Sequence, residues 1–87
     1  MSDKQPSNAL VFFGATGDLA FKKIFPALQA MARHGTLDFP VIGVGRDPMP
    51  REQLVERARA SVTEHGGGVD AKAFPILAER LDYVGGD

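Results

Sequence analysis

Short apolar runs alternate with longer segments of helical periodicity along this chain. Residues 9–13 form a continuous run of β-branched, aromatic and aliphatic side chains, bounded by residues that favour turns. A run of this kind is typical of a strand that is buried on both faces, as in a parallel sheet. Residues 41–44 predict a second buried strand, and residues 82–84 are a third candidate.

A helical pattern follows the first run, from about Gly17 to His34, and Gly35 then provides a stop. Pro26 lies inside this predicted helix, where it removes the hydrogen bond to the Lys22 carbonyl. In an ordinary helix interior that loss costs about 3 kcal/mol. The proline either kinks the helix or splits off its first turns, and we expect a kink.

Two further helices are predicted between the second and third strands. One runs from residue 50 or 51 to about residue 65 and ends at the glycines of residues 66–68. A shorter one covers about residues 70–81 and is interrupted at Pro75. The order β-α-β-α(α)-β predicts the α/β class with a parallel, doubly wound sheet, specifically the first half of a Rossmann-type domain.

The domain organisation follows from this order. Residues 1–8 are polar and predict a flexible leader, whereas residues 9–87 predict the N-terminal portion of a dinucleotide-binding domain. The chain stops where a loop would leave the third strand. We therefore expect it to be truncated, with a substrate and catalytic domain absent from it.

The turn after the first strand carries the clearest candidate chemistry. Its pattern is G-x-x-G-x-x-A, in which Gly14 permits a tight turn, Gly17 lets a diphosphate approach, and Ala20 permits close helix packing. The N–H groups and dipole of the following helix would favour phosphates. The alternative is a plain tight β–α turn without a ligand.

Arg46 stands at the end of the second strand, where a cofactor with a free ribose usually meets an acidic residue. A guanidinium instead fits a 2′-phosphate bidentately, so the sequence favours NADP over NAD. A solvated surface arginine is the alternative. The neighbouring Asp47 opens an Asp-Pro turn, but its carboxylate leaves use of NAD open.

Composition and charge exclude several other classes of function. Ten basic and eleven acidic residues give a net charge of -1, which offers no case for a nucleic-acid or anionic-membrane partner. The absence of cysteine excludes disulfides and thiolate metal sites, and two distant histidines cannot form a metal site by themselves. Neither a membrane span nor a signal peptide is evident, so we expect a cytoplasmic chain.

Several segments together resemble the glucose-6-phosphate dehydrogenase family. Gly-Ala-Thr-Gly-Asp-Leu-Ala at residues 14–20, followed by Lys-Lys-Ile-Phe-Pro at residues 22–26, is similar to the family's N-terminal signature. Ile-Gly-Val-Gly-Arg at residues 42–46 and Leu-Asp-Tyr-Val at residues 81–84 continue the resemblance. The first motif is specific, because nucleotide binding in general does not demand its lysines or its proline.

The resemblance implies an NADP-dependent oxidation of glucose 6-phosphate to 6-phosphogluconolactone, at the entry to the pentose phosphate pathway. It implies that Lys23 contacts the substrate, Arg46 contacts the 2′-phosphate, and Asp87 borders the adenosine. Phe21 stands where many relatives have a basic residue, so that position receives no charge role. We also expect a homo-oligomer of the full-length protein. The implied diphosphate turn comprises Gly14, Ala15, Thr16, Gly17, Asp18, Leu19 and Ala20.

The catalytic base of the family has no match here. That base is a histidine in an Arg-Ile-Asp-His-Tyr-Leu-Gly-Lys segment, whereas His34 and His65 each fall in the last turn of a predicted helix. An imidazolium suits a helix C-terminus, so both are expected to be capping or solvated residues. The sequence therefore predicts no catalytic residue in this chain, no metal site, and no activity of this portion alone.

Two other functions stay open at this point. An extended short-chain NAD(P) reductase also uses a Gly-Ala-Thr-Gly turn, although Ala20 and the Lys-Lys-x-x-Pro run depart from that family. A Tyr-x-x-x-Lys pair further along the natural chain would favour it. The other alternative is a non-catalytic NADP-binding module, against which the exposed edges of a half-sheet argue.

Overall fold

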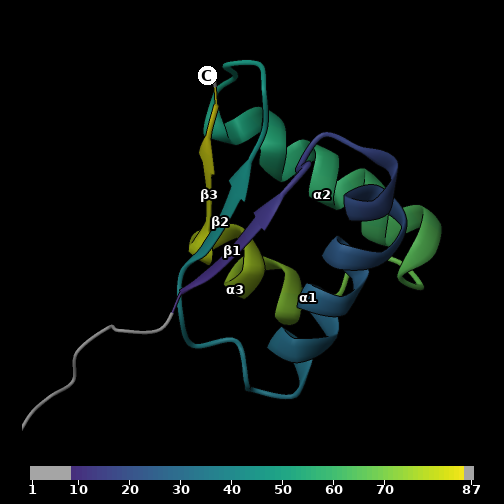
Figure 1. Ribbon diagram of the computed structural model, residues 1–87. Helices are drawn as coiled ribbons and strands as arrows, with labels where there is room; N and C mark the ends of the chain where they lie inside the picture. The colour runs from purple at the N-terminus through teal and green to yellow at the C-terminus, as the bar shows by residue number, and fades with distance from the viewer. Residues whose placement is uncertain (1–8, 86–87) are drawn as a thin grey trace, which may run out of the picture.

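The computed structural model describes residues 9–85, which form a three-stranded parallel sheet with helices packed against it (Figure 1). The strands lie in the order β1-β2-β3, as the α/β prediction requires. The predicted leader at residues 1–8 and the predicted adenosine contact Asp87 lie outside the described residues. The elements are β1 (Leu10–Phe13), η1 (Ala20–Ile24, a π-helix), α1 (Phe25–Arg33), β2 (Val41–Val44), α2 (Arg51–His65), α3 (Ala73–Arg80) and β3 (Leu81–Val84).

The helices cover one face of the sheet. Phe12, Val41 and Leu81 are buried in the core, whereas Phe13 is 77% exposed and Val84 is 56% exposed. The prediction that the first strand is buried on both faces is therefore wrong for the residues described. A continuous apolar run indicates that both faces can accept a neighbour, but it does not indicate which neighbours the fold supplies.

The expected kink at Pro26 takes another form. The first turns are split off as the π-helix η1, which ends where the Phe25 N–H donates to a carbonyl five residues back. Pro26 then lies in the first turn of α1, where a missing N–H removes no bond of the α-helix. Because Pro26 cannot donate to the Phe21 carbonyl five residues before it, the Ser61 hydroxyl of α2 donates to that carbonyl instead.

The other predicted helices agree closely with the structure. The helix predicted from residue 50 or 51 to about 65 is α2, and the shorter one is α3. The interruption expected at Pro75 does not occur. This proline lies in the first turn of α3, where its missing N–H does not interrupt the ladder.

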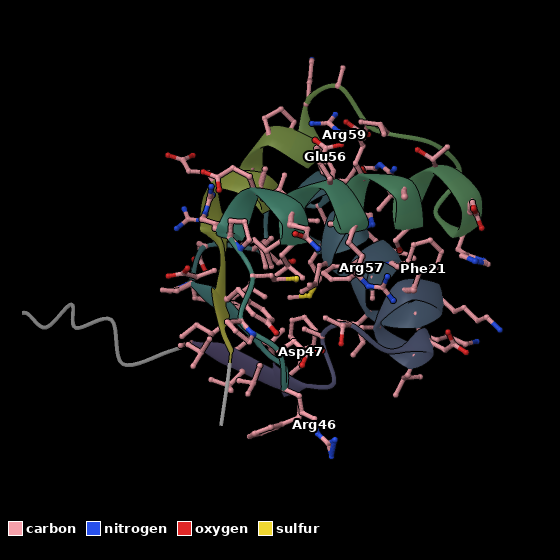
Figure 2. All side chains as sticks on the ribbon, turned by 90° about the horizontal axis from the view of Figure 1, so that it is seen from above. Phe21, Arg46, Asp47, Glu56, Arg57 and Arg59 are labelled. Atoms are coloured by element: carbon pink, nitrogen blue, oxygen red, sulfur yellow. The ribbon has the colours of Figure 1, made fainter. Side chains whose placement is uncertain are left out.

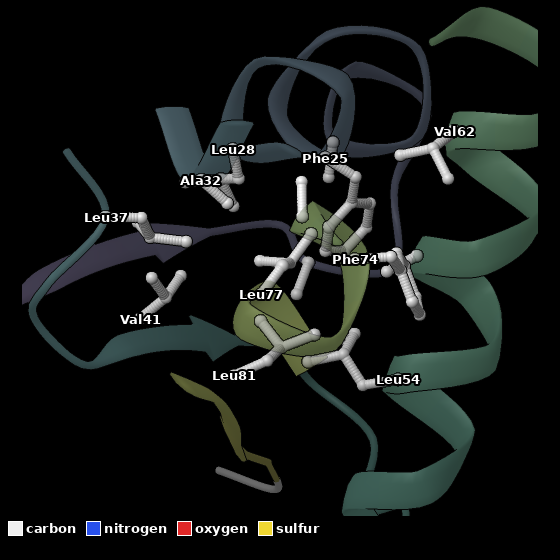
Figure 3. Close-up of a cluster of buried hydrophobic side chains, with 14 of the residues drawn as sticks. Phe25, Leu28, Ala32, Leu37, Val41, Leu54, Val62, Phe74, Leu77 and Leu81 are labelled. Carbon is white, nitrogen blue, oxygen red and sulfur yellow. The ribbon is translucent and has the colours of Figure 1, made fainter. Parts of the chain in front are cut away.

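One hydrophobic core lies between the sheet and the three α-helices (Figure 3). Phe25 is fully buried at its centre, and its ring meets the ring of Phe12 edge to face, with centroids 5.8 Å apart. Such a contact adds packing energy beyond area burial. The core thus fixes the start of α1 against β1, and the glycine turn lies in the segment between these two elements, before η1. The labelled core side chains are Phe25, Leu28, Ala32, Leu37, Val41, Leu54, Val62, Phe74, Leu77 and Leu81.

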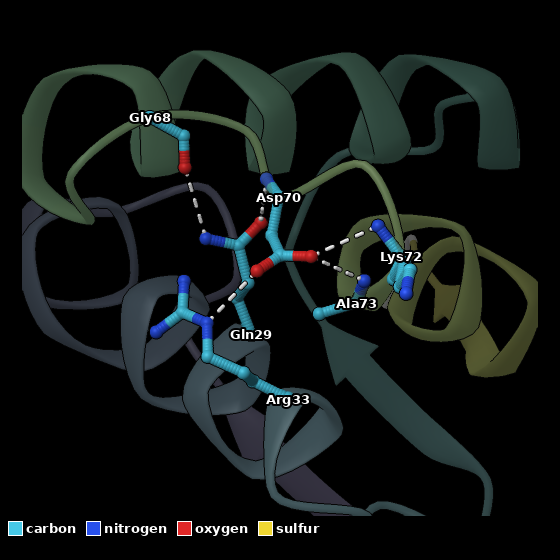
Figure 4. Close-up of polar contacts among 6 residues, drawn as sticks. All are labelled: Gln29, Arg33, Gly68, Asp70, Lys72 and Ala73. Atoms are coloured by element: carbon cyan, nitrogen blue, oxygen red, sulfur yellow. Dashed lines mark hydrogen bonds and ion pairs between the residues drawn. The ribbon is translucent and has the colours of Figure 1, made fainter.

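A polar network fastens α1 to the loop before α3 (Figure 4). Buried Gln29 donates to the Gly68 carbonyl (3.0 Å) and accepts from the Asp70 N–H (3.1 Å). Arg33 donates to one carboxylate oxygen of Asp70 (2.9 Å), and two N–H groups at the start of α3 donate to the other. The Arg33 hydrogen bond, followed by those two backbone bonds, lowers the pKa of Asp70 from 3.8 to about 2.

Candidate dinucleotide-binding site

The glycine turn between β1 and η1 is shaped by backbone hydrogen bonds. Gly14 has φ +74°, a left-handed conformation that side chains other than glycine rarely adopt. The Ala15 N–H donates to the Val44 carbonyl (3.0 Å), and the Gly17 N–H donates back to the Gly14 carbonyl (2.9 Å). The turn is thereby closed on itself and held against the end of β2.

Gly43 in the middle of β2 allows this close approach. A Cβ at Gly43 would lie 2.9 Å from the Cβ of Ala15, 3.2 Å from the Phe12 ring and 3.3 Å from Leu54. The signal in the sequence that could identify Gly43 is a glycine inside a strand pattern, which commonly marks close approach by another backbone. Gly43 is therefore a residue on which the position of the turn depends.

A hollow of ≈ 470 Å³ lies between the glycine turn and the end of β2. It is at the carboxyl ends of the strands, the edge at which open α/β sheets bind ligands. Within residues 9–85, no heavy atom outside Gly14 and its two chain neighbours lies within 4 Å of the place where a Cβ on Gly14 would be, so the space beside the turn is open to a ligand. The hollow is lined by Phe13, Gly14, Thr16, Gly17, Val44, Gly45, Arg46 and Asp47.

The structure brings four of the predicted cofactor residues to this hollow, namely Gly14, Thr16, Gly17 and Arg46. Arg46 is exposed and extends from the end of β2 (Figure 2). The backbone turn and Arg46 therefore line one cavity from two different elements. This arrangement could hold a ligand that carries two separated anionic groups.

The other predicted site residues have different surroundings. Ala15 and Ala20 are buried in the core, so their side chains pack and do not face the hollow. Asp18 and Leu19 are exposed at the start of the helical segment, and Leu19 is 67% exposed. Lys23 is exposed on η1 and does not line the hollow.

Tyr83 shapes the loop that carries Arg46. Its hydroxyl donates to the carbonyl of Asp47, and its ring lies against Gly45. In the sequence, Tyr83 belongs to the Leu-Asp-Tyr-Val segment of the family resemblance, and no local pattern indicates this role. Asp47 is exposed beside Arg46, and the chain bends at these two residues without a hydrogen-bonded turn over residues 47–50, so the expected Asp-Pro turn is present only as a bend.

The two histidines lie away from the hollow. His34 caps the C-terminus of α1, and His65 is the last residue of α2, where its ring meets the Phe21 ring with centroids 5.6 Å apart. Among residues 9–85, no group of three His, Asp or Glu side chains is placed to hold a metal ion. Within the same residues, no helix is long and apolar enough to cross a membrane.

Comparison with known proteins decides the family. A family model described as "Glucose-6-phosphate dehydrogenase, NAD binding domain" matches residues 11–87. The chain belongs to the glucose-6-phosphate dehydrogenase family. The extended short-chain reductase that the glycine pattern left open is accordingly not favoured.

Relatives within the glucose-6-phosphate dehydrogenase family are similar over nearly all of the chain. Glucose-6-phosphate 1-dehydrogenase 1 of Mycobacterium tuberculosis (strain H37Rv) is 48% identical over 83 residues, which cover 93% of this chain and 17% of the relative. The glucose-6-phosphate 1-dehydrogenase of Gluconobacter oxydans is 47% identical over 82 residues, which cover 85% of this chain and 16% of that relative. The chain thus spans less than a fifth of the length of these relatives.

Solved structures of the family have the same fold. The crystal structure of glucose-6-phosphate 1-dehydrogenase from Mycobacterium avium superposes with a TM-score of 0.86 at 45% identity, over 94% of this chain and 18% of that chain. A second glucose-6-phosphate dehydrogenase was solved with its substrate glucose 6-phosphate. It gives a TM-score of 0.77 at 31% identity, over 91% of this chain and 17% of that chain. The α/β, Rossmann-type prediction is confirmed.

Proposed function

We propose that this chain is the N-terminal, NADP-binding portion of an oxidoreductase that oxidises glucose 6-phosphate at C1 to 6-phosphogluconolactone. The observation that carries the proposal is a single hollow, lined by both the glycine turn and Arg46, in a chain of the glucose-6-phosphate dehydrogenase family. The two anionic groups of NADP, its diphosphate and its 2′-phosphate, have matching partners at these two places.

The residues present fit this cofactor. Backbone N–H groups at the turn and at the helix start would hold the diphosphate, because the helix N-terminus carries a partial positive charge. Arg46 would pair with the 2′-phosphate, for which its planar fork of donors is suited. Asp47 beside it could accept from a ribose hydroxyl, so use of NAD remains part of the proposal as a secondary activity.

The chemistry of the reaction needs groups beyond the described residues. The nicotinamide supplies a hydride acceptor when NADP is bound. The described part of this chain contributes binding and orientation, and no residue of it is assigned as the catalytic base. Lys23, exposed on η1, is proposed as a contact of the sugar phosphate, and the solved relative that contains glucose 6-phosphate supports this choice of substrate.

The remaining parts of the proposal concern the whole protein. We place it in the pentose phosphate pathway, in the cytoplasm, and as a homo-oligomer. Residues 9–87 are proposed as the N-terminal portion of its dinucleotide-binding domain, and they are expected to be inactive alone. Any turnover of glucose 6-phosphate by this portion alone would contradict that expectation.

The test is a direct titration of the full-length natural protein with NADP and with NAD, together with an assay of glucose 6-phosphate oxidation. We expect reduction of NADP that depends on glucose 6-phosphate, and tighter binding of NADP than of NAD. Equal or tighter binding of NAD would contradict the assigned role of Arg46. Absence of both binding and turnover would contradict the proposed function as a whole.

A further inference from the structure

Arg57 on α2 reaches the inner side of the glycine turn. Its Nη2 atom donates to the carbonyls of Thr16 (2.8 Å) and Gly17 (3.1 Å), although some forty residues separate them in the chain. The guanidinium carbon lies 5.0 Å from the centroid of the Phe21 ring, so the charged group is also held against an aromatic face (Figure 2). Three contacts thus fix one side chain beside the turn.

This placement is not explained by stability alone. The Nε atom of Arg57 is buried and has no hydrogen-bond partner, the one such side-chain nitrogen or oxygen in the part of the chain that the structure describes. A buried donor without a partner costs free energy, and native structures contain few of them. Arg57 therefore carries a cost in folding free energy while it is hydrogen-bonded to the candidate site. This combination indicates a functional role.

The two hydrogen bonds determine where the turn presents its own donors. Because a trans peptide unit is planar, its carbonyl and the following N–H point in opposite directions. Holding the Gly17 carbonyl toward α2 therefore turns the Asp18 N–H away from α2. Among residues 9–85, the N–H groups of Thr16 and Asp18 donate to no backbone acceptor, so they remain available to a ligand.

The same contacts change the electrostatics of the turn. A carbonyl oxygen carries partial negative charge and would repel a diphosphate, and two of these oxygens are here bound to a cation. The guanidinium also adds a full positive charge close to the N-terminus of the helical segment, where the partial charge already favours anions. Both effects favour an anionic group at the turn without direct contact from Arg57.

We propose that Arg57 is a positioning residue for the diphosphate of the dinucleotide, acting through the carbonyls of Thr16 and Gly17. The proposal rests on the proposed NADP-binding function and deepens it. Arg57 and Arg46 thereby have separate roles. Arg46 selects the 2′-phosphate at the end of β2, whereas Arg57 orders the turn that receives the diphosphate.

The chain offers a matched control for this role. Arg59 lies on the same helix and also stacks on a phenylalanine, with its guanidinium carbon 4.9 Å from the centroid of the Phe74 ring. Its Nε atom pairs with Glu56 at 3.4 Å, and no contact links it to the glycine turn. Arg59→Gln therefore removes the same charge and the same kind of stacking as Arg57→Gln, but leaves the turn intact.

The experiment measures the binding of two ligands to the full-length protein and to its variants. NADP uses both anionic subsites, whereas adenosine 2′-monophosphate has only the 2′-phosphate and lacks the diphosphate. We expect Arg57→Gln to weaken NADP by about tenfold and to change adenosine 2′-monophosphate by less than about twofold. Arg59→Gln should leave both affinities unchanged, and Arg57→Lys, which keeps the charge, should restore part of the NADP affinity.

Other outcomes overturn the proposal. An equal loss for the two ligands would indicate a general structural role, and an unchanged NADP affinity would indicate no role in binding. The same loss in Arg59→Gln would indicate an effect of net charge. If Arg57→Gln does not fold, the affinities for NADP and adenosine 2′-monophosphate are compared in Arg57→Lys instead. A wild-type protein that binds no NADP contradicts the proposed function itself, which separates the two failures.

Discussion

The phenol ring of Tyr83, a residue of β3, lies against Gly45 and occupies the space that a Cβ on Gly45 would need. From there its hydroxyl donates to the Asp47 carbonyl. The loop that carries Arg46 is thus held on the inner side by one ring and one hydrogen bond. Glycine at position 45 is required by this close approach, since its φ is not in the left-handed region.

Gly45→Ala should therefore displace the ring and break the hydrogen bond to Asp47. We expect a loss of about 1–2 kcal/mol in the free energy of unfolding, together with weaker NADP binding as the Arg46 loop shifts. Thermal unfolding and NADP titration measure the two effects. Combining Gly45→Ala with Tyr83→Ala removes the obstacle, so the double variant should lose less than the sum of the single variants. Strict additivity would show that the ring and Gly45 are independent.

Gly43→Ala tests the contact between β2 and the glycine turn. The new Cβ would lie 2.9 Å from the Cβ of Ala15, which must move away with the turn. Overpacking of this kind costs about 1–3 kcal/mol, and NADP binding should weaken with it. Exchanging the two residues in Ala15→Gly/Gly43→Ala relieves that contact and should recover part of the NADP affinity. No recovery would place the damage at Phe12 or Leu54 instead.

The local parts of the site could be predicted from the sequence. The position of the glycine turn follows from a strand pattern before it and a helix pattern after it, and Arg46 follows from the end of the second strand. Contacts between distant segments could not be predicted this way. The bonds of Arg57 to Thr16 and of Tyr83 to Asp47 join residues 41 and 36 positions apart, and no periodicity encodes them.

The first helix shows a second limit of prediction from the sequence. The sequence indicated that Pro26 would disturb the helix, but not how the disturbance would be accommodated. The outcome depends on Ser61, a residue of another helix that donates to the carbonyl left without its usual partner. Similarly, the apolar run of β1 indicated burial, while only the packing of the helices determined that Phe13 is 77% exposed.

Arg46→Gln should separate the two cofactors. Removing the guanidinium is expected to weaken NADP by about ten- to a hundredfold and to leave NAD nearly unchanged, because NAD lacks the 2′-phosphate. Titration of both cofactors into the full-length protein measures this. Arg80→Gln is the control, since Arg80 is an exposed cation of equal charge at the opposite end of the sheet. A parallel loss of NAD would point to damage of the loop rather than to recognition of the phosphate.

Acid should weaken the attachment of α1 to α3 through Asp70. The pKa of this carboxyl is lowered to about 2 in the fold, first by the Arg33 hydrogen bond, from 3.8 in the unfolded chain. The stabilisation is therefore complete above about pH 4 and is lost as the pH falls toward about 2. Stability curves of wild type and Asp70→Asn should converge over this window. Arg33→Gln should raise the Asp70 pKa toward 3.8 in an NMR titration, and an unchanged pKa would refute the role of Arg33.

Ser61→Ala removes the donor that satisfies the Phe21 carbonyl in the π-helix η1. Since Pro26 has no N–H to offer, that partly buried carbonyl would lose its partner, at a cost of about 1–3 kcal/mol in the free energy of unfolding. Pro26→Ala restores an N–H at the residue five positions after Phe21. In the Ser61→Ala background this N–H replaces the lost donor, so Pro26→Ala should recover part of the lost stability there. In the wild type, Ser61 already satisfies the carbonyl, and Pro26→Ala should bring no such gain. Denaturant unfolding of the four proteins gives the coupling energy, and a value of zero would mean that the serine and the proline do not act on the same carbonyl.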